Sequence, residues 1–380
     1  MKILVVNYEY PPIGGGGGSS CKEIAERLAE RGHKVDVFTA GYKGFPALEK
    51  VNQNLTICRI KSNRKSEHEV GAMGLVSFIF RGMFKIKKFA SKKKYDVIHY
   101  HFSVPTGLLT FFHDKKTPYI TTLHGIDTPG FHADEFPLFQ KVTKPFNKKI
   151  INKASAVVAV SENLKAKAKE TFKNKGIEVI YHGVDIDKFK KLGVSKNNSS
   201  VDFICIARLV KFKRIDVLLK AFKLLTKKTD KKVSLTIAGT GYMEQELKSL
   251  SSKLGLNNSV NFAGYVSHET LPELINRHHA FVLPSVHDSF GIVFLEAMAC
   301  GLPCIGAKAA GVPEVVNHEV TGLLAEPEDE VSLSEHLLTF TENGKLRNQM
   351  GEKAFMVVRE QFSWESIVSK YEALYERITG

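Results

Sequence analysis

The sequence of 380 residues lacks any uncharged stretch long enough to cross a bilayer as a helix. Its longest uncharged stretches, residues 70–80 and 102–113, fall well short of the roughly 20 residues that a spanning helix needs. The short apolar run that follows Met1 is likewise too brief for the central segment of a signal peptide. We therefore expect a cytoplasmic protein.

Cysteine is scarce, and the five that occur are odd in number and scattered, which argues against a disulfide framework. Cys300 and Cys304 lie four residues apart, but no second pair or nearby histidine completes a zinc-binding set. We expect buried structural cysteines: Cys21, Cys58, Cys205, Cys300 and Cys304.

Motifs for metal binding are also missing. His99 and His101 share one face of an expected strand, but two ligands do not make a site. The His-Glu pairs at 68–69, 268–269 and 318–319 never extend to His-Glu-x-x-His. Asp185-x-Asp187 is interpreted as a turn where the chain passes between domains. We expect no metal site.

In the first half of the chain, acidic residues are too few to balance the basic ones. Residues 1–190 contain 32 Lys and Arg against 18 Asp and Glu, whereas residues 191–380 contain 22 of each sign. The first half should therefore attract an anionic partner such as a membrane surface or an anionic acceptor. Nucleic acid is the less favoured partner, and we expect none.

Strand-like and helix-like segments alternate along both halves, which predicts an α/β protein with parallel sheets. In the first half we expect strands at 3–7, 35–39, 96–100, 119–123 and 156–160, and a helix from Ser20 to Arg31. The pattern restarts after residues 190–200, a Lys-, Asn- and Ser-rich linker candidate. The predicted domains are residues 1–190 and 191–362, followed by a separate amphipathic helix at 363–380.

Gly14–Gly18 follow the first expected strand, but their spacing fails both nucleotide-binding loop patterns. Ser19, Ser20 and Cys21 stand where G-x-G-x-x-G needs its last glycine, and no Gly-Lys-Ser/Thr follows. A glycine loop that ends at a helix N-terminus can still accept a phosphate or cover a substrate. A purely structural turn is the alternative.

Cations and glycines recur at the expected strand ends of the second half. Arg208 ends one strand and Lys213 follows five residues later, so both could neutralise a diphosphate. Gly239 and Gly241 mark the next strand end, where the backbone could approach a ligand closely. Taken singly, each of these features is more often structural.

The segment 287–303 carries two carboxylates, Asp288 and Glu296, around a Phe290-Gly291 turn. We expect a helix to begin near Gly291, where free N–H groups could approach a phosphate, and to stop at Cys300-Gly301 and Pro303. Glu296 would lie one turn inside, within reach of the vicinal hydroxyls of a ribose. The alternative is an ordinary amphipathic helix with two solvated acids.

His124 stands at the end of an expected first-half strand, with Asp127 three residues on. An imidazole at this place could hydrogen-bond a substrate. A buried structural histidine is the alternative.

In combination, these segments resemble the retaining glycosyltransferases of family 4. The resemblance runs over nearly the whole chain, through Pro11-Pro12-x-Gly-Gly, Ile24-Ala25, Gly32-His33-x-Val, His124-Gly125, Gly183-Val184-Asp185, Arg208-Leu209 with Lys213, Gly264-Tyr265-Val266, Leu283-Pro284-Ser285, Phe290-Gly291, Glu296-Ala297-Met298-Ala299, Gly311-x-Pro-Glu314 and Thr321-Gly322-Leu323.

The resemblance implies the GT-B fold: two Rossmann-like domains that face a central cleft, with the last helix packed back on the first domain. It further implies a nucleotide-sugar donor, UDP- rather than GDP-linked, and no cofactor. The implied catalytic residues are His124, Arg208, Lys213, Asp288 and Glu296. From its position three residues after His124, we expect Asp127 on the acceptor side. The implied donor-binding residues are Gly15, Gly16, Gly241, Phe290, Gly291, Ile292, Val293 and Glu296.

The resulting hypothesis is a metal-independent, retaining transfer of a sugar to an acceptor hydroxyl in polysaccharide, glycolipid or glycoconjugate synthesis. Asp288 departs from the family, whose acidic pair is usually two glutamates, so the identity of the sugar stays open. A sugar-nucleotide 2-epimerase of the same fold and a non-catalytic nucleotide-sugar-binding protein are the alternatives.

The acceptor is not specified by these motifs. The apolar run Gly71–Phe80 and the cations that follow it resemble a monotopic membrane anchor, which would suit a lipid-linked acceptor and a peripheral location on the inner face of the membrane. A solvated basic face is the alternative. These cations are Arg81, Lys85, Lys87, Lys88, Lys92, Lys93 and Lys94.

Overall fold

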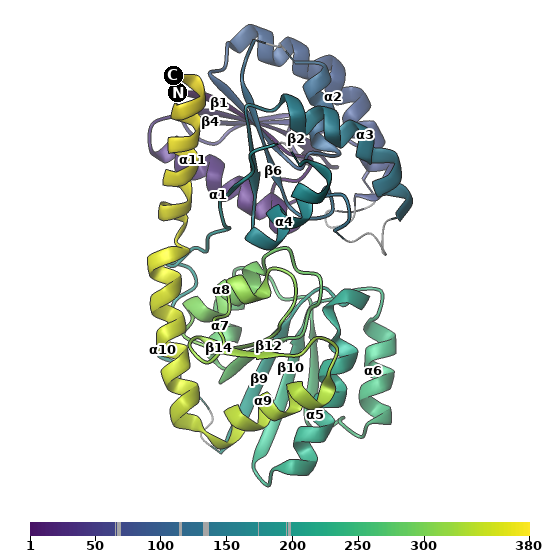
Figure 1. Cartoon of the computed structure of the whole chain (residues 1–380), viewed down its shortest axis with the longest axis vertical. Coiled ribbons are helices and arrows are strands. Elements are labelled where there is room, and N and C mark those ends of the chain that lie inside the picture. Colours follow the sequence, from purple (N-terminus) through teal and green to yellow (C-terminus); the bar gives the residue numbers. More distant parts are fainter. Residues whose placement is uncertain are drawn as a thin grey trace. The chain divides into compact units, whose positions relative to one another are not determined.

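The computed structural model describes residues 1–64, 66, 70–113, 116–131, 137–173, 175–194, 196 and 199–380. These residues form two compact units, each built around one largely parallel sheet with helices packed on it (Figure 1). The first unit comprises Met1–His182 and Trp364–Gly380, and the second comprises Gly183–Ser363. The predicted α/β class with two parallel-sheet domains is confirmed.

The chain passes from the first unit to the second between His182 and Gly183, earlier than the expected boundary at 190/191. The first residues of the expected linker belong to the second unit, where the side chain of Asn276 makes two hydrogen bonds to their backbone. Its side chain accepts from the N–H of Leu192 at 2.8 Å and donates to the carbonyl of Lys190 at 3.0 Å. Residues 195, 197 and 198 of that linker, and the His-Glu pair at 68–69, lie outside the described residues.

The first sheet has the order β3-β4-β2-β1-β5-β6-β7-β8, with only β3 and β4 antiparallel among its described strands. Its strands are β1 (Lys2–Val6), β2 (Lys34–Gly41), β3 (Leu48–Lys50), β4 (Leu55–Lys61), β5 (Val97–His101), β6 (Tyr119–Leu123), β7 (Ala156–Ala159) and β8 (Glu178–Val179). Its helices are α1 (Gly16–Glu30), α2 (Gly71–Lys93), η1 (Thr106–Phe111), α3 (Pro137–Lys153), α4 (Glu162–Thr171) and α11 (Trp364–Thr379).

Alternating side chains of this sheet pack on two different helix layers. Ile3 and Val5 belong to a buried cluster that includes residues of α1 and α11. On the other face of β2, the ring of Phe38 lies 6.3 Å from Phe78 and 5.9 Å from Phe89 of α2, between ring centroids. Because both faces are covered, the central strands are buried almost throughout, including polar residues such as His99, His101 and Thr122.

Helix α11 belongs to the first unit although it follows the whole second unit in sequence. Tyr371 and Tyr375 are buried in the cluster beneath α1, and Arg31, just after α1, contacts Glu365 at 3.1 Å and Glu372 at 2.8 Å. The last helix is therefore part of the first core.

The second sheet has the order β11-β10-β9-β12-β13-β14, and all its pairs are parallel. Counted within the unit this order is 3-2-1-4-5-6, that of a dinucleotide-binding fold. Its strands are β9 (Ser200–Ile206), β10 (Lys232–Ala238), β11 (Val260–Gly264), β12 (Ala280–Leu283), β13 (Cys304–Ala307) and β14 (Gly322–Ala325). Its helices are η2 (Lys211–Lys213), α5 (Ile215–Lys228), α6 (Glu244–Lys253), α7 (Leu271–Asn276), α8 (Ile292–Ala299), η3 (Val312–Glu314), α9 (Glu330–Glu342) and α10 (Gly344–Gln361).

Glycines allow the loop after β10 to touch the loop after β9. Leu209 donates its N–H to the carbonyl of Thr240 at 2.9 Å, which draws the two backbones together. A Cβ on Gly239 would stand 1.9 Å from the carbonyl oxygen of Ala207, and one on Gly241 would stand 2.2 Å from that of Leu209. Gly239 also has φ of +133°, which side chains strongly disfavour.

We predict that Gly239→Ala destabilises the protein by about 3 kcal/mol or more, since it combines overlap with backbone strain. Gly193→Ala is the matched control, because a Cβ there meets nothing within 4 Å. Thermal unfolding of both variants checks this, and equal midpoints would contradict it.

Candidate functional site

In the second sheet, chain connections reverse direction between β9 and β12, and ligands of such sheets bind beyond the strand ends at that point. The loops after these two strands are joined directly, since Val286 donates its N–H to the carbonyl of Phe212 at 3.1 Å. This edge therefore brings together three residues from the sequence prediction: Arg208, Lys213 and Asp288.

Lys213 and Asp288 form an ion pair, with Nζ 2.5 Å from Oδ1. Both side chains are largely buried, at 12% and 14% exposure, so solvent screens this pair weakly. The second carboxylate oxygen, Oδ2, is buried and has no hydrogen-bond partner among the described residues. A carboxylate oxygen with no partner, beside a fixed ammonium, can accept a hydrogen bond from a hydroxyl group of a ligand.

Arg208 and Lys213 both lie near the ring of Phe212. The guanidinium carbon of Arg208 is 6.0 Å from the ring centroid, and Nζ of Lys213 is 5.3 Å from it. Arg208 is exposed, in contrast to Lys213. One cation is thus held in place and the other can reach an anion at the surface.

Helix α8 begins where the sequence predicted. Gly291 precedes it with φ of +95°, Phe290 is buried, and Cys300 and Gly301 end it. The N–H groups of Ile292 and Val293 open the helix and have no intrahelical acceptor, so this end can receive an anion. A Cβ on Gly311 would stand 2.4 Å from the carbonyl oxygen of Ser289, which explains glycine at that position.

Glu296 of α8 is buried at 9% exposure and does not stand alone. Nε2 of His268 lies 2.9 Å from its Oε1, and Nζ of Lys188 lies 2.9 Å from Nδ1 of the same imidazole. Because the ammonium can only donate, the imidazole proton sits on Nε2 and points at the carboxylate. Sequence reasoning missed His268 and Lys188, because no local pattern links three residues so far apart in the chain.

Gly241 has a packing role in the structure. As described above, its Cα lies against the carbonyl of Leu209, and Lys211 donates its N–H to the hydroxyl of Tyr242 at 3.1 Å. The glycine is needed for the contact between the two loops. Its part in donor binding stays a prediction.

In the first unit, His124 follows β6 and joins three other histidines. The rings of His99, His101, His124 and His182 stand in a column, with successive centroids 4.1, 5.3 and 5.4 Å apart. We call this set the histidine column. The sequence predicted His124 as a site residue but not its three neighbours in the column.

Each end of the histidine column is held by a hydroxyl group. His99 contacts Tyr375 of α11 and Thr122, both at 2.8 Å, and His182 contacts Ser20 of α1 at 2.9 Å. Within the column, Nε2 of His124 lies 3.1 Å from Nδ1 of His101. Nδ1 of His124 is itself buried and has no hydrogen-bond partner among the described residues, so its hydrogen-bonding capacity is unused.

Burial keeps the histidine column neutral. It lowers the pKa of His99 to about 3, with a smaller contribution from His124, and that of His182 to about 3. It also places the pKa values of His101 and His124 well below their ordinary value. His124 therefore acts as a neutral hydrogen-bonding group near pH 7, not as an imidazolium.

Asp127 is fully buried and serves the loop that carries His124. Its Oδ1 accepts from the N–H groups of His124 at 2.9 Å and Gly125 at 3.1 Å, and its Oδ2 accepts from the N–H of Ser103 at 2.7 Å. Burial raises the pKa of this carboxyl to about 6, against the lowering effect of these N–H groups. This geometry makes Asp127 a positioning residue and gives no support to the expected direct contact with an acceptor.

Helix α1 begins earlier than expected, inside the glycine run. The helix starts at Gly16 instead of Ser20, and Gly15 precedes it with its N–H donated to Glu9 at 3.1 Å. A Cβ on Gly17 would stand 2.6 Å from the ring of Phe102, so glycine lets this turn pack closely. Gly15 and Gly16 are exposed, but the N–H of Gly15 is already donated to the carboxylate of Glu9 and would have to leave it to bind a phosphate.

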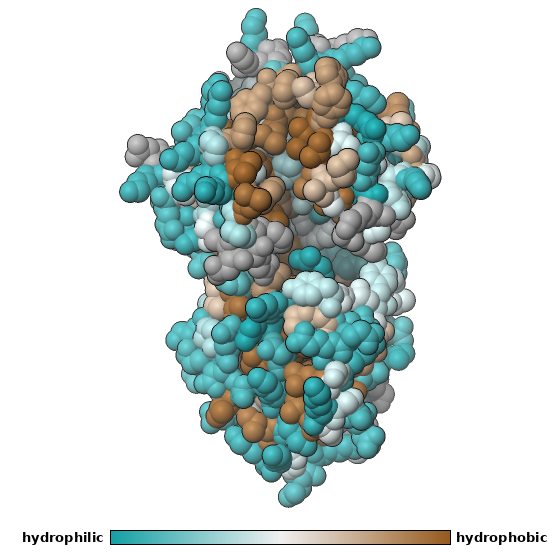
Figure 2. Space-filling view, turned by 90° about the vertical axis from the view of Figure 1, so that its right-hand side faces the viewer, coloured by the Kyte–Doolittle hydropathy of each residue, from teal (hydrophilic) through white to brown (hydrophobic). Residues whose placement is uncertain are grey.

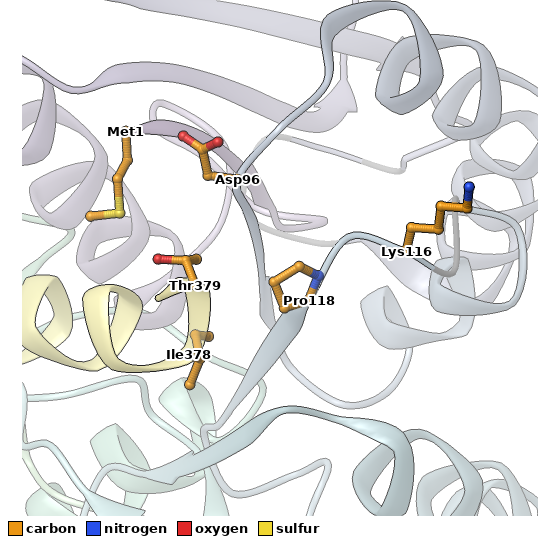
Figure 3. A pocket seen from close by; sticks show the side chains of 6 residues that line it. All are labelled: Met1, Asp96, Lys116, Pro118, Ile378 and Thr379. Atoms are coloured by element: carbon orange, nitrogen blue, oxygen red, sulfur yellow. The ribbon is translucent and has the colours of Figure 1, made fainter.

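Other features of the first unit lie away from these groups. The hollow in Figure 3 is at the opposite edge of the sheet, at the beginnings of β1, β5 and β6, and is lined by Met1, Asp96, Lys116, Pro118, Ile378 and Thr379.

Within the described ranges, no three His, Cys, Asp or Glu residues are placed to hold a metal ion. No helix there combines the length and apolar character needed to span a membrane.

Comparison with known proteins covers both units. Residues 14–188 match the family described as Glycosyltransferase Family 4, and residues 186–356 match Glycosyl transferases group 1. The chain is 30% identical over 389 residues to N-acetyl-alpha-D-glucosaminyl L-malate synthase of Bacillus anthracis, covering 99% of this chain and 97% of that protein.

Solved structures share the fold. Sucrose-phosphate synthase from Thermosynechococcus elongatus superposes with a TM-score of 0.85 at 20% identity, covering 100% and 99% of the two chains. HepE from Anabaena, solved with UDP and glucose, superposes with a TM-score of 0.76 at 21% identity and 99% coverage of both.

We predict that the histidine column makes the protein sensitive to mild acid. Unfolded histidine binds a proton below its ordinary pKa of 6.5, whereas folded His99 and His182 do not until about pH 3. Stability should therefore fall as the pH drops from about 6.5, by about 2 kcal/mol for each of these two at pH 5. Asp127 offsets part of this loss, by about 1 kcal/mol at pH 5, since its raised pKa adds stability as the pH falls from about 6 toward 3.8.

Thermal unfolding between pH 7 and pH 5 measures the effect, and His182→Gln should flatten the pH dependence. His318→Gln, at a half-exposed histidine of the second unit, should leave it unchanged. A flat wild-type profile would refute the prediction.

Proposed function

This chain belongs to glycosyltransferase family 4, and we propose that it is a retaining enzyme that moves a sugar from a nucleoside-diphosphate sugar to an acceptor hydroxyl. One observation carries the proposal. At the reversal point of the second sheet, the ion-paired Lys213, the exposed Arg208 and the N-terminus of α8 lie along one edge, and α8 also carries the buried Glu296.

The proposed reaction exchanges one bond at the anomeric carbon for another. The bond from C1 of the sugar to the diphosphate oxygen breaks, and the acceptor oxygen bonds to C1 on the same face. The acceptor proton passes to the departing phosphate, so the products are a glycoside with retained configuration and a nucleoside diphosphate.

The protein's part is to stabilise the charge that develops on the leaving diphosphate. Lys213 is held by Asp288 and thus needs little rearrangement, while Arg208 and the opening N–H groups of α8 add positive potential. Preorganised donors of this kind often supply the largest contribution to catalysis. With these cations in place we propose that no metal ion is required.

Glu296 is proposed to bind the ribose through its carboxylate. Its partner His268, itself held by Lys188, donates to one oxygen and fixes the direction of the other. Asp288 is proposed to contact the transferred sugar through Oδ2, the oxygen without a partner among the described residues. Because Asp is one methylene shorter than Glu, this is where we expect donor preference to be decided.

In the first unit, His124 is proposed to contact the sugar through Nδ1 as a neutral imidazole, and the backbone at Gly15 and Gly16 to contact the donor. Asp127 is proposed to fix the loop of His124. These roles rest on the family resemblance and on the local geometry of each group.

The names of the relatives suggest first substrates. HepE was solved with UDP and glucose, and the Bacillus anthracis relative is named an N-acetyl-alpha-D-glucosaminyl L-malate synthase. UDP-N-acetylglucosamine and UDP-glucose are therefore the first donors to test. Saccharide, lipid-linked and small hydroxy-acid acceptors form the acceptor panel, with cell-surface glycan synthesis as the proposed context.

We predict that Lys213→Ala lowers kcat by roughly a hundredfold or more, since it removes a charge that acts on the leaving group. Lys227→Ala, at an exposed position on the adjacent helix α5, is the matched control. Release of nucleoside diphosphate under saturating donor measures both, and a wild-type rate for Lys213→Ala would exclude the assignment.

We predict that a donor screen finds nucleotide release that depends on an acceptor and persists in EDTA. NMR of the product should show the anomeric configuration of the donor. Release of nucleotide with an altered free sugar and no acceptor would favour a 2-epimerase. Binding without turnover would favour a non-catalytic protein, and an inverted product would refute retention.

A further inference from the structure

Helix α2 has two apolar faces, and only one of them packs on the sheet. Phe78 and Ile86 on the inner face are fully buried. The outer face carries four more large apolar side chains at successive turns, all 60–68% exposed: Met73, Val76, Phe80 and Phe84. The rings of Phe80 and Phe84 are 5.5 Å apart and edge-on, so the outer face is itself a small cluster.

Helix α3 repeats this arrangement. Leu138, Val142 and Phe146 follow one another at intervals of four residues and are 73%, 57% and 46% exposed. Because four residues are about one helical turn, the three lie along one side of the helix. The sequence did not predict this exposed apolar side of α3.

The two helices are joined through η1. Leu109 of η1 would lie 3.1 Å from a Cβ on Gly82 of α2, and Ile150 of α3 would lie 3.1 Å from a Cβ on Gly107 of η1. Phe112, just after η1, is 36% exposed. Figure 2 shows apolar side chains gathered over this part of the first unit. We call the outer sides of α2 and α3, with Phe112, the apolar–basic face.

The charge of these helices has one sign. Together α2 and α3 contain eleven Lys and Arg and no Asp or Glu. Lys85 and Lys87 of α2 are exposed, as are Lys141 and Lys144 of α3. The side chain of Lys92 is not among those described. Nowhere in the described part of the chain do these four exposed lysines pair with a carboxylate.

We infer that the apolar–basic face docks on an anionic lipid bilayer. Exposed apolar residues scattered singly need no explanation, but a contiguous group on neighbouring helices marks an interaction site. Aromatic and aliphatic side chains enter the headgroup boundary, while lysines on the same helices meet lipid phosphates. The absence of any carboxylate from both helices favours an anionic surface over a neutral one.

This inference extends beyond glycosyl transfer, because it uses none of the residues assigned to donor binding. It would bring the first unit to a membrane without a spanning segment, as an enzyme acting on a lipid-linked acceptor requires. The exposed sides of both α2 and α3 must take part, since a single amphipathic contact with few charges binds membranes weakly and reversibly.

The test is sedimentation of the full chain with vesicles at physiological salt. One set contains phosphatidylcholine alone, and the other contains phosphatidylcholine mixed with phosphatidylglycerol. The wild type should sediment with the mixed vesicles and stay in solution with the neutral ones. Transfer to a soluble acceptor is measured in parallel, so failure of membrane binding is distinguished from failure of the proposed activity.

Two paired variants and two controls locate the surface. Phe80→Ser with Phe84→Ser and, separately, Lys141→Gln with Lys144→Gln should each weaken vesicle binding by roughly tenfold or more. Met356→Ser, at an exposed apolar residue of α10, and Lys227→Gln with Lys228→Gln, at the end of α5, should leave it unchanged. Thermal unfolding and soluble-acceptor activity confirm that each variant is folded.

Loss of vesicle binding in both test pairs, with retention in both controls, supports the inference. It is overturned if the wild type does not bind mixed vesicles, or if either test pair binds as the wild type does. It is also overturned if the phenylalanine pair converts a dimer to a monomer without affecting vesicle binding, because a second copy of the chain would then cover this face.

Discussion

Parallel strand pairing is the constraint on which the rest of this structure depends. Parallel strands all end at the same edge of their sheet, so the loops after them must lie together. In the second unit this places Lys213, from the loop after β9, against Asp288, from the loop after β12. In the first unit it aligns the end of β5, with His101, beside the end of β6, with His124. Each candidate group is thus positioned by the sheet before any ligand binds.

Much of this arrangement could be predicted because its signals are local. The alternation of apolar strands with helices predicts both parallel sheets, and Gly291 and Gly301 mark the ends of α8 correctly. The clustering of Lys213 and Asp288 follows once both are placed at strand ends. The start of α1 was missed because glycine is a poor helix former, yet close packing against Phe102 favours it there.

The remaining features depend on contacts between distant residues. His268 meets Glu296, and Tyr375 meets His99, across separations that no sequence pattern encodes. Asp127 carries the chemistry of a site residue, but its Oδ1 binds its own loop and its Oδ2 binds Ser103 in the loop after β5, which only the folded backbone reveals. The exposed apolar side of α3 was not predicted, because Pro145 lies inside that helix and proline argues against a helix in the sequence.

The return of α11 to the first unit has a consequence for the order of synthesis. The second unit is one continuous segment, complete when Ser363 has left the ribosome, whereas the first needs Tyr371 and Tyr375 to close its core. Until then, the buried face of α1 and the imidazole of His99 lack their partners from α11. The unit that is translated first is therefore the one that finishes folding last, and its half-built core must be kept from aggregation while the rest of the chain is made.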